Sequence, residues 1–330
     1  MSRSKGKDKT TLPQLACVNP TLTAVKGISV GHAMHKSEHT GCTVILLSPA
    51  SPVAVDARGG YPTTFDTHGI ETSKAYVKRD AIFLSGGDVF GLAAASGVQK
   101  YLVESGLASD QAGKRLPLVV GATIYDLHGS RVSRVDYASL ALDACRKATP
   151  EPVKLGRVGV GAGASAGNFA GHEFSTKSGV GSSAAKIAGS ITVAALVVVN
   201  SMGNIFDFGT GRVVAGAKRN GRPLSFEDFQ FEYITGIKRE KKKRNTTLAV
   251  VATDARLEHE ELLKVAQLAH NGLAMTIRPV HTSEDGDTVF AVSTGKLEIR
   301  GQRTKYLDLI GYYSSMVVAR SIVSIFKKKV

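Results

Sequence analysis

The tripeptide Asn245-Thr246-Thr247 holds the residues best placed for covalent chemistry. It stands between a basic loop and an apolar run, residues 247–253, that predicts a buried strand. A threonine at a free N-terminus can attack a carbonyl through its hydroxyl, while its own α-amine, with a pKa of about 8, takes the proton. The position therefore suits a precursor that cuts itself before Thr246, although the same tripeptide, taken alone, is far more often an ordinary strand start.

Asp285 and Asp287 form a second candidate group. Residues two apart in an extended segment lie on one face, and two close carboxylates split each other's pKa values. Such a pair can orient an amine or pass on a proton. An isolated Asp-Gly-Asp is nevertheless more often a turn or a casual cation site.

Two other patterns are better explained by structure than by chemistry. The segment 85–88, Ser-Gly-Gly-Asp, lacks the Lys-Ser/Thr of a phosphate-binding loop, so it predicts a tight strand-to-helix turn in which Asp88 caps the helix. His32, His35 and His39 have no fourth ligand beside them. We therefore expect no metal site and no cofactor.

Strands and helices must position these residues, and they alternate without the regular spacing of a doubly wound fold. Apolar runs predict strands at residues 43–47, 53–55, 81–84, 118–125, 191–200, 247–253 and 289–292. Helical periodicity predicts helices at residues 89–104, 137–148, 258–276 and 307–326. The Ser-Pro residues at 48–52 predict a break between the first two strands.

The connecting segments differ in composition. Residues 156–183 are rich in Gly, Ser and Ala, which predicts loops whose backbone passes close to other parts of the chain. Residues 206–215 read as a hairpin that bends at Gly209-Thr210-Gly211. Residues 223–244 lack periodicity and end in a basic run, so they predict an exposed connector before Thr246.

The formal charge of +14 is concentrated in three segments. Residues 1–10 carry +3, residues 238–244 carry +5 and residues 327–329 carry +3. The rest of the chain is nearly neutral, which argues against a nucleic-acid-binding surface. We interpret the basic segments as solvated ends and one exposed loop.

Cysteines and apolar runs indicate the cellular environment. Cys17, Cys42 and Cys145 are widely spaced, so they predict buried apolar side chains and no disulfides. No secretion signal is evident, and the apolar stretch at residues 191–199 is too short to cross a bilayer. We expect a cytoplasmic protein without a membrane partner.

About ten segments, in order, resemble the DmpA-type aminopeptidase/D-amidase family of self-processing N-terminal-nucleophile hydrolases. That family includes β-aminopeptidyl peptidases and nylon-oligomer hydrolases. The resemblance extends from about Gly27 to Thr294, and its segments are residues 30–32, 40–45, 55–60, 85–92, 124–126, 161–167, 197–200, 245–255, 278–282 and 285–290.

The resemblance implies a role for each matching residue. Thr246 corresponds to the nucleophile, and Asn245 becomes the new C-terminus after self-cleavage. Asn200 corresponds to the amide that stabilises the oxyanion, and Tyr125 to a tyrosine that helps to hold the site. The family places the Asp285–Asp287 pair beside the N-terminal threonine, and an Asp-x-Asp pair is typical of the nylon-oligomer hydrolases.

One position departs from that pattern. Nylon-oligomer hydrolases have a site lysine where this chain has Asn168, directly after Gly167. Lys177 begins a glycine-rich segment that resembles another family motif, so it is a candidate to supply the positive charge.

The resemblance also implies the architecture. We expect an α/β fold, an αββα layered sandwich of the DmpA/ornithine-acetyltransferase type, processed into two fragments. Residues 1–22 form a disordered tail, residues 23–245 the large fragment and residues 246–330 the small one. Both fragments form one globular domain, and the chain forms a homo-oligomer such as a tetramer.

The substrate class stays open at this stage. Peptides with a free amine, β-peptides, D-amides and oligoamides all fit an amidohydrolase with an acyl-Thr246 intermediate. Two alternatives remain: an acyl transferase similar to ornithine acetyltransferase, and a non-catalytic protein that binds nucleic acid through its basic loops. The confinement of charge to tails makes the second alternative the weaker one.

Overall fold

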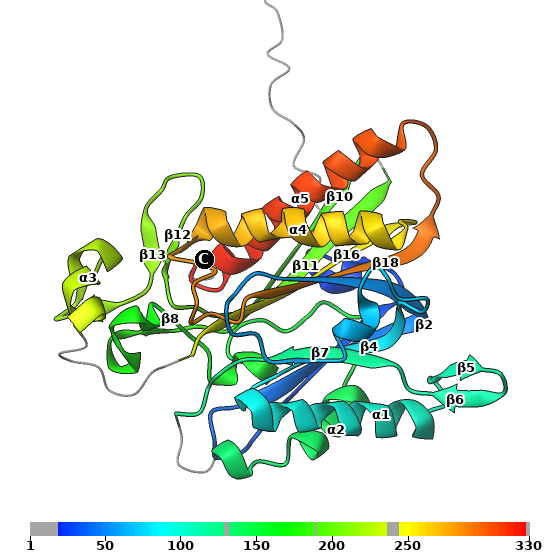
Figure 1. Cartoon of the computed structure of the whole chain (residues 1–330), viewed down its shortest axis with the longest axis horizontal. Coiled ribbons are helices and arrows are strands. Elements are labelled where there is room, and N and C mark those ends of the chain that lie inside the picture. Colours follow the sequence, from blue (N-terminus) through cyan, green and yellow to red (C-terminus); the bar gives the residue numbers. More distant parts are fainter. Residues whose placement is uncertain (1–18, 129–131, 189, 236–243, 328–330) are drawn as a thin grey trace, which may run out of the picture.

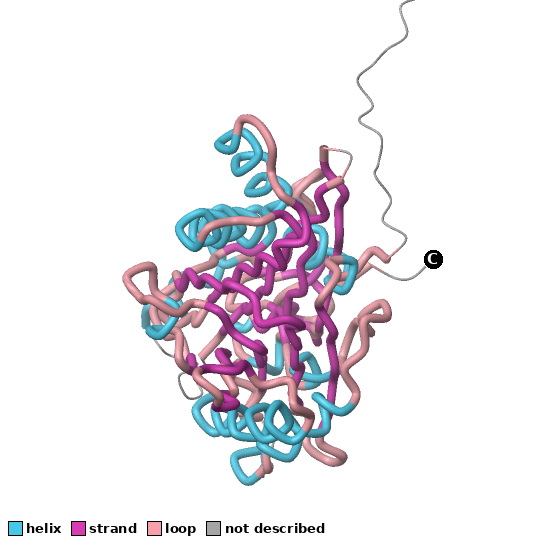
Figure 2. The backbone as a smooth tube through the Cα atoms, turned by 90° about the vertical axis from the view of Figure 1, so that its right-hand side faces the viewer, coloured by secondary structure: helices cyan, strands magenta, loops and turns pink. Residues whose placement is uncertain are grey.

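Two β-sheet layers packed between two helical layers make up the fold (Figure 1). The computed structural model describes residues 19–128, 132–188, 190–235 and 244–327. Figure 2 shows the strands in the middle of the molecule and helices on both sides of them. The expected αββα sandwich is therefore confirmed.

The first layer contains the strands β1 (Ile28–Met34), β2 (Gly41–Ala57), β3 (Thr64–Phe65), β4 (Lys78–Ser85) and β7 (Val119–Thr123). The second contains β10 (Val180–Ile187), β11 (Ile191–Asn200), β16 (Thr246–Ala255) and β18 (Thr288–Leu297). β16 lies between β11, to which it is antiparallel, and β18, to which it is parallel. The strand that begins at Thr246 is thus central in its sheet.

β2 belongs to both layers. Residues 41–47 pair with β1, and residues 53–57 pair with β18 of the other sheet. The expected break at residues 48–52 is wrong, because the chain stays extended there while its pairing with β4 becomes irregular between Leu46 and Ser51. Proline is compatible with an extended backbone where a strand bends and its ladder is interrupted. The Ser-Pro segment therefore turns one strand from one sheet to the other.

Helices cover the outer face of each layer (Figure 1). α1 (Ala94–Glu104) and α2 (Tyr137–Arg146) pack on the first layer, and α4 (His259–Thr276) and α5 (Arg303–Ser324) pack on the second. The predicted helices at these positions are confirmed, except that residues 88–93 form a 3₁₀ segment before α1.

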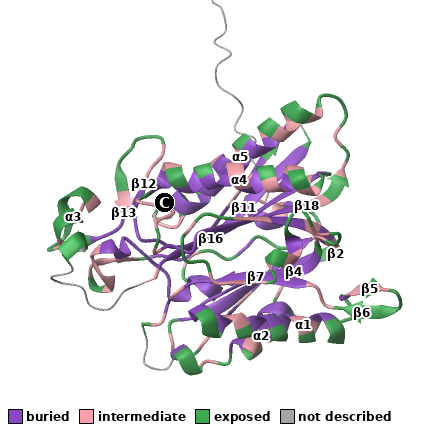
Figure 3. Ribbon diagram, in the orientation of Figure 1, coloured by how far each residue is buried: buried purple, intermediate pink, exposed green. Residues whose placement is uncertain are grey.

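Burial on both faces explains why the second layer reads as unbroken apolar sequence. All ten residues of β11 are buried. Alternate residues pack against the helices, as Val197 does, or against the opposite sheet, as Leu196 does. Figure 3 shows this buried interior between helices whose outer surfaces are exposed. Cys42 and Cys145 are buried as predicted, whereas Cys17 lies outside the described residues.

Several segments differ from the sequence predictions. α3 (Phe226–Thr235) forms inside the expected connector, where Phe229 packs on Phe169 with ring centroids 5.5 Å apart. β1 and β10 were not predicted. The hairpin of β12 (Asn204–Phe206) and β13 (Val213–Ala215) is confirmed.

The remaining strands are short: β5 (Ser109–Gln111), β6 (Lys114–Leu116), β8 (Ser165–Ala166), β9 (Thr176–Lys177), β14 (Lys218–Arg219), β15 (Arg222–Pro223) and β17 (Ile277–Arg278). Thr21 and Leu22 are buried, so the body begins before the expected end of the tail at residue 22. Residues 1–18 and the basic residues 238–243 lie outside the described ranges. Within those ranges, none of the helices has the length and apolar character needed to span a bilayer.

The core between the sheets predicts a large effect of Phe290→Ala. Phe290 is fully buried on β18, and removal of such a ring typically costs about 3–5 kcal/mol of the free energy of unfolding. Urea denaturation measures the loss. The control is Phe231→Ala on α3, where the side chain is exposed and the loss is expected to stay within about 0.5 kcal/mol. Equal losses would contradict this description of the core.

Candidate active site

Thr246 is the first residue of β16 and lies beside the last residue of β11. The register pairs Thr246 with Asn200, so two of the predicted site residues meet at one end of the sheet. Thr246 is 5% exposed and Asn245 is 3% exposed. The Thr246 hydroxyl donates to the Asn245 carbonyl oxygen over 2.5 Å. The hydroxyl therefore lies against the peptide group expected to be cut.

The loop that follows β17 holds this peptide group. The Asn245 amide donates to the Glu284 carbonyl over 3.0 Å, and the Gly286 amide donates to the Asn245 carbonyl over 2.7 Å. These bonds form an isolated parallel bridge between Asn245 and Asp285. An N–H group fixed at a carbonyl oxygen is the arrangement that stabilises an oxyanion when that carbonyl is attacked.

Gly286 has no room for a side chain. A Cβ added there would lie 2.7 Å from the Thr246 hydroxyl and 2.8 Å from the Tyr61 carbonyl oxygen. Its backbone is not in the left-handed region, so the requirement for glycine is one of space. Gly286 stands inside the predicted Asp-Gly-Asp segment but was not itself predicted as a site residue.

Asp287 positions the residue after the candidate nucleophile. Its buried carboxylate accepts the Thr247 amide over 2.7 Å and the His281 amide over 3.0 Å. The His281 ring nitrogen Nδ1 lies 2.9 Å from the same carboxylate. His281 has a φ of +57°, which is unusual for a residue with a side chain, and these contacts hold it there.

Asp285 turns toward different partners. Its carboxyl group accepts the Thr282 amide over 2.9 Å and the Thr282 hydroxyl over 2.7 Å. Burial, and next the charge of Asp287, raise the pKa of Asp285 to about 7. The structure thus brings both carboxyl groups to the start of β16, and Asp285 is able to hold a proton near neutral pH.

Asn200 and Tyr125 meet through a main-chain group. The Asn200 amide nitrogen donates to the Tyr125 carbonyl over 2.9 Å, and its oxygen accepts the Ser165 amide over 3.2 Å. A primary amide has two N–H groups, so this bond uses one of them. The Tyr125 ring stands edge-on to His128, with centroids 6.1 Å apart.

Asn168 and Lys177 occupy different environments. Asn168 is buried, and its amide exchanges hydrogen bonds with Ser165: the Ser165 hydroxyl donates over 2.8 Å, and the Asn168 nitrogen donates to the Ser165 carbonyl over 3.2 Å. β9 pairs Lys177 with Ser165, but the Lys177 side chain is exposed. The structure therefore brings the main chain of Lys177 near Asn168 and leaves its charge at the surface.

A short segment after β2 crosses the site loop. The amides of Arg58 and Gly59 donate to the Asp287 carbonyl over 3.0 and 3.3 Å, and the Tyr61 amide donates to the Asp285 carbonyl over 2.8 Å. These bonds place the main chain of Tyr61 close to Gly286, on the side that also faces the Thr246 hydroxyl. Tyr61 was not among the residues predicted to lie near Thr246.

Arg244 and Asp88 are two further residues that the sequence analysis assigned elsewhere. Arg244 donates to Asp88 over 3.0 Å and to the Tyr61 hydroxyl over 2.6 Å. The prediction that Asp88 caps a helix is wrong: Gly87 occupies the cap position, and the Asp88 carboxylate accepts from Arg244 and from the Thr63 hydroxyl. The sequence marks Asp88 only as an acidic residue after a predicted strand. It marks Arg244 only as the last residue of the basic run.

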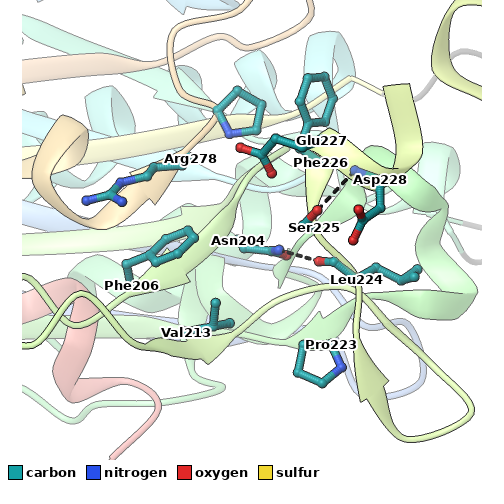
Figure 4. A pocket seen from close by; sticks show the side chains of 11 residues that line it. Asn204, Phe206, Val213, Pro223, Leu224, Ser225, Phe226, Glu227, Asp228 and Arg278 are labelled. Carbon is teal, nitrogen blue, oxygen red and sulfur yellow. Dashed lines mark hydrogen bonds between the residues drawn. The ribbon is translucent and has the colours of Figure 1, made fainter. Parts of the chain in front are cut away.

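A cavity of about 430 Å³ lies between the β12–β13 hairpin, the start of α3 and β17 (Figure 4). The Asn204 amide donates to the Leu224 carbonyl over 2.7 Å at its wall. Its lining residues are Asn204, Phe206, Val213, Pro223, Leu224, Ser225, Phe226, Glu227, Asp228, Arg278 and Pro279. None of the predicted site residues is among them.

Comparison with protein families gives one assignment over nearly the whole chain. A sequence profile of peptidase family S58 matches residues 20–328. An uncharacterised aminopeptidase of Mycobacterium leprae is 36% identical over 299 residues, which cover 84% of this chain and 79% of the relative. A 6-aminohexanoate-oligomer endohydrolase of Paenarthrobacter ureafaciens is 32% identical over 277 residues, which cover 83% of this chain and 74% of the relative.

Solved structures share the fold. A β-aminopeptidase of a Burkholderia species has a TM-score of 0.67 and 19% identity, and the match covers 93% of this chain and 86% of that one. An L-aminopeptidase D-Ala-esterase/amidase of Ochrobactrum anthropi, described as a variant of the Ntn hydrolase fold, has a TM-score of 0.66 and 18% identity. That match covers 93% of this chain and 85% of the other.

The raised pKa of Asp285 predicts how stability changes with pH. The folded protein holds this proton more tightly than the unfolded chain, where the carboxyl pKa is 3.8. The associated stability is complete below pH 4 and is lost as the pH rises toward 7, by at most about 1.4 kcal/mol for each pH unit. The asparagine of Asp285→Asn cannot ionise. Between pH 4 and 7 we therefore expect the free energy of unfolding of this variant to fall less than that of the parent protein.

Denaturant titrations at several pH values measure this difference. Burial also raises the pKa of Asp126 to about 7, but Asp126 is present in both proteins, so its contribution cancels in the comparison. Parallel curves between pH 4 and 7 would show that Asp285 ionises normally in the folded protein.

Proposed function

The chain belongs to peptidase family S58 and is a hydrolase of amide or peptide bonds, and we propose that it cuts itself between Asn245 and Thr246 and then uses Thr246 as its nucleophile. The single observation that carries this proposal is the position of the Asn245 carbonyl group. Its oxygen lies 2.5 Å from the Thr246 hydroxyl oxygen and 2.7 Å from the Gly286 amide nitrogen. One group can attack, and the other can stabilise the charge that attack creates.

Self-cleavage would proceed through an ester. The Thr246 oxygen attacks the Asn245 carbonyl carbon, and the developing oxyanion accepts the Gly286 N–H. The hydroxyl proton passes to the nitrogen as the carbon–nitrogen bond breaks, which leaves Asn245 esterified to the Thr246 oxygen and frees the Thr246 amine. Water hydrolyses the ester and releases the Asn245 carboxylate. Asp287 accepts the Thr247 amide and so holds the start of β16 in place for this reaction.

Turnover of substrate would repeat the chemistry on another amide. The free Thr246 amine takes the hydroxyl proton as the oxygen attacks, the substrate amine leaves, and water releases the acid from the acyl-Thr246 ester. The second N–H of Asn200 is available to the oxyanion. The pKa of Asp285, about 7, suits proton exchange with the amine at neutral pH. The side chain of Lys177 is exposed, and its role as the positive charge of the site stays a prediction that loss of activity in Lys177→Ala would support.

The relatives support small peptides or oligoamides as substrates, because one is named an aminopeptidase and another a 6-aminohexanoate-oligomer endohydrolase. We expect the fragments 23–245 and 246–330 to stay associated after cleavage. β16 is hydrogen-bonded on one side to β11 of the large fragment and on the other to β18 of the small one. The proposed homo-oligomer, such as a tetramer, rests on the family resemblance alone.

The proposal predicts two fragments from the purified chain. Denaturing electrophoresis is expected to resolve a small fragment of about 9 kDa, its residue share of 34.8 kDa, that begins Thr-Thr-Leu-Ala. Thr246→Ala removes the attacking oxygen and is expected to leave one intact chain without amidase activity. Thr246→Ser keeps the hydroxyl and is expected to be processed. An intact chain that hydrolyses amides, or an active Thr246→Ala variant, would refute the proposal.

Gly286→Ala is expected to slow self-cleavage by about 100-fold or more. The new methyl group would meet the Thr246 hydroxyl at 2.7 Å and displace either that oxygen or the Gly286 amide. The measurement is the fraction of intact chain over time after purification. Gly209→Ala in the β12–β13 hairpin is the matched control, because its Cβ would meet only Asp207, at 3.4 Å. Normal processing of Gly286→Ala would show that this close contact does not constrain the reaction.

A further inference from the structure

The Arg244 guanidinium is bound by three kinds of contact. It forms an ion pair with Asp88 at 3.0 Å, donates to the Tyr61 hydroxyl over 2.6 Å, and stacks over the Tyr61 ring with its central carbon 4.0 Å from the centroid. A carboxylate, a hydroxyl and an aromatic face together make a specific site for a planar cation. A solvated surface arginine makes no such set of contacts.

Asp88 depends on this cation. Its side chain is 7% exposed, whereas the Arg244 side chain is 39% exposed. One carboxylate oxygen accepts the Thr63 hydroxyl over 2.9 Å, and the other accepts Arg244. Removal of Arg244 would leave an almost buried carboxylate without a counter-ion, which is costly. Another cation would therefore be favoured in the same place.

This cation site lies next to the candidate nucleophile. A Cβ on Gly286 would be 2.8 Å from the Tyr61 carbonyl oxygen and 2.7 Å from the Thr246 hydroxyl, so the main chain of Tyr61 lies close to that hydroxyl on the same side of Gly286. Arg244 itself is joined through Asn245 to the peptide bond expected to be cut. A group held by Asp88 and Tyr61 is thus on the acyl side of the reacting carbonyl.

We propose that Asp88 and Tyr61 form a substrate subsite that selects amides whose acyl part carries a guanidinium group. In the precursor, Arg244 occupies this subsite. After cleavage, Asn245 must leave before another carbonyl can reach Thr246, and Arg244 leaves with it because the two are adjacent in the chain. The inference rests on the proposed function and adds a substrate class to it.

The test compares two dipeptide p-nitroanilides on the processed enzyme, arginyl-asparagine and citrullinyl-asparagine. They match residues 244–245, and citrulline replaces the guanidinium with a neutral urea of nearly the same shape. We expect kcat/KM to be at least about tenfold higher for the arginyl compound, which corresponds to about 1.4 kcal/mol. In Asp88→Asn this ratio is expected to fall close to one, while hydrolysis of the citrulline compound persists. Glu298→Gln, at an exposed ion pair with Arg256, is expected to keep the parent ratio.

A second measurement uses only the parent enzyme, in case Asp88→Asn does not mature. Butylguanidinium is expected to inhibit the citrulline reaction at a concentration at least about tenfold lower than butylurea. Equal rates for the two anilides, together with equal inhibition, would overturn the subsite while amide hydrolysis stands. Failure of the processed enzyme to hydrolyse alanyl-alanine p-nitroanilide as well would overturn the proposed function and the subsite with it.

Discussion

The hydrogen bond from the Gly286 amide to the Asn245 carbonyl, 2.7 Å long, is the contact on which the arrangement of the site depends. It joins the loop before β18 to the residue before β16. The same bond brings the carboxyl groups of the two residues that flank Gly286 close to the start of β16. Asp287 reaches the Thr247 amide, and Asp285 turns back to Thr282. Since a side chain at position 286 would strike the Thr246 hydroxyl, the residue between the two aspartates has to be glycine.

The pairing of the strands in the second layer holds the Gly286–Asn245 hydrogen bond in place. β16 is parallel to β18, so the start of β16 and the loop before β18 lie at the same end of the layer. β11 runs the other way and brings Asn200 to that end. All three strands are buried on both faces over most of their length, and the helices and the opposite sheet hold them in register. A chain cut before Thr246 would lose one peptide bond and keep nearly all of this packing.

Local pattern was sufficient for β11, which is an unbroken apolar run, and for α4, whose apolar residues recur along one face of the helix. It failed where packing at a distance decides the structure. β2 continues through its prolines because its two halves pair with strands of different sheets, β1 and β18. α3 forms where Phe229 packs on Phe169, which is far away in sequence. The grouping of Asn200, Thr246 and the aspartates came from the family resemblance, since no local periodicity relates residues so far apart.

Arg244 shows the same limit in one residue. Its place at the end of a basic run predicts a solvated charge, and the charge run contains no sign that this member has a partner 156 positions away. The partner is an acid only 7% exposed, so an ion pair there is far more sensitive to loss of one member than a surface pair would be. The residues at 244 and 245 therefore have two demands on them at once. In the proposed mechanism their contacts hold the peptide against Thr246 before cleavage, and the surfaces they would leave behind define the shape and charge that a later substrate would meet.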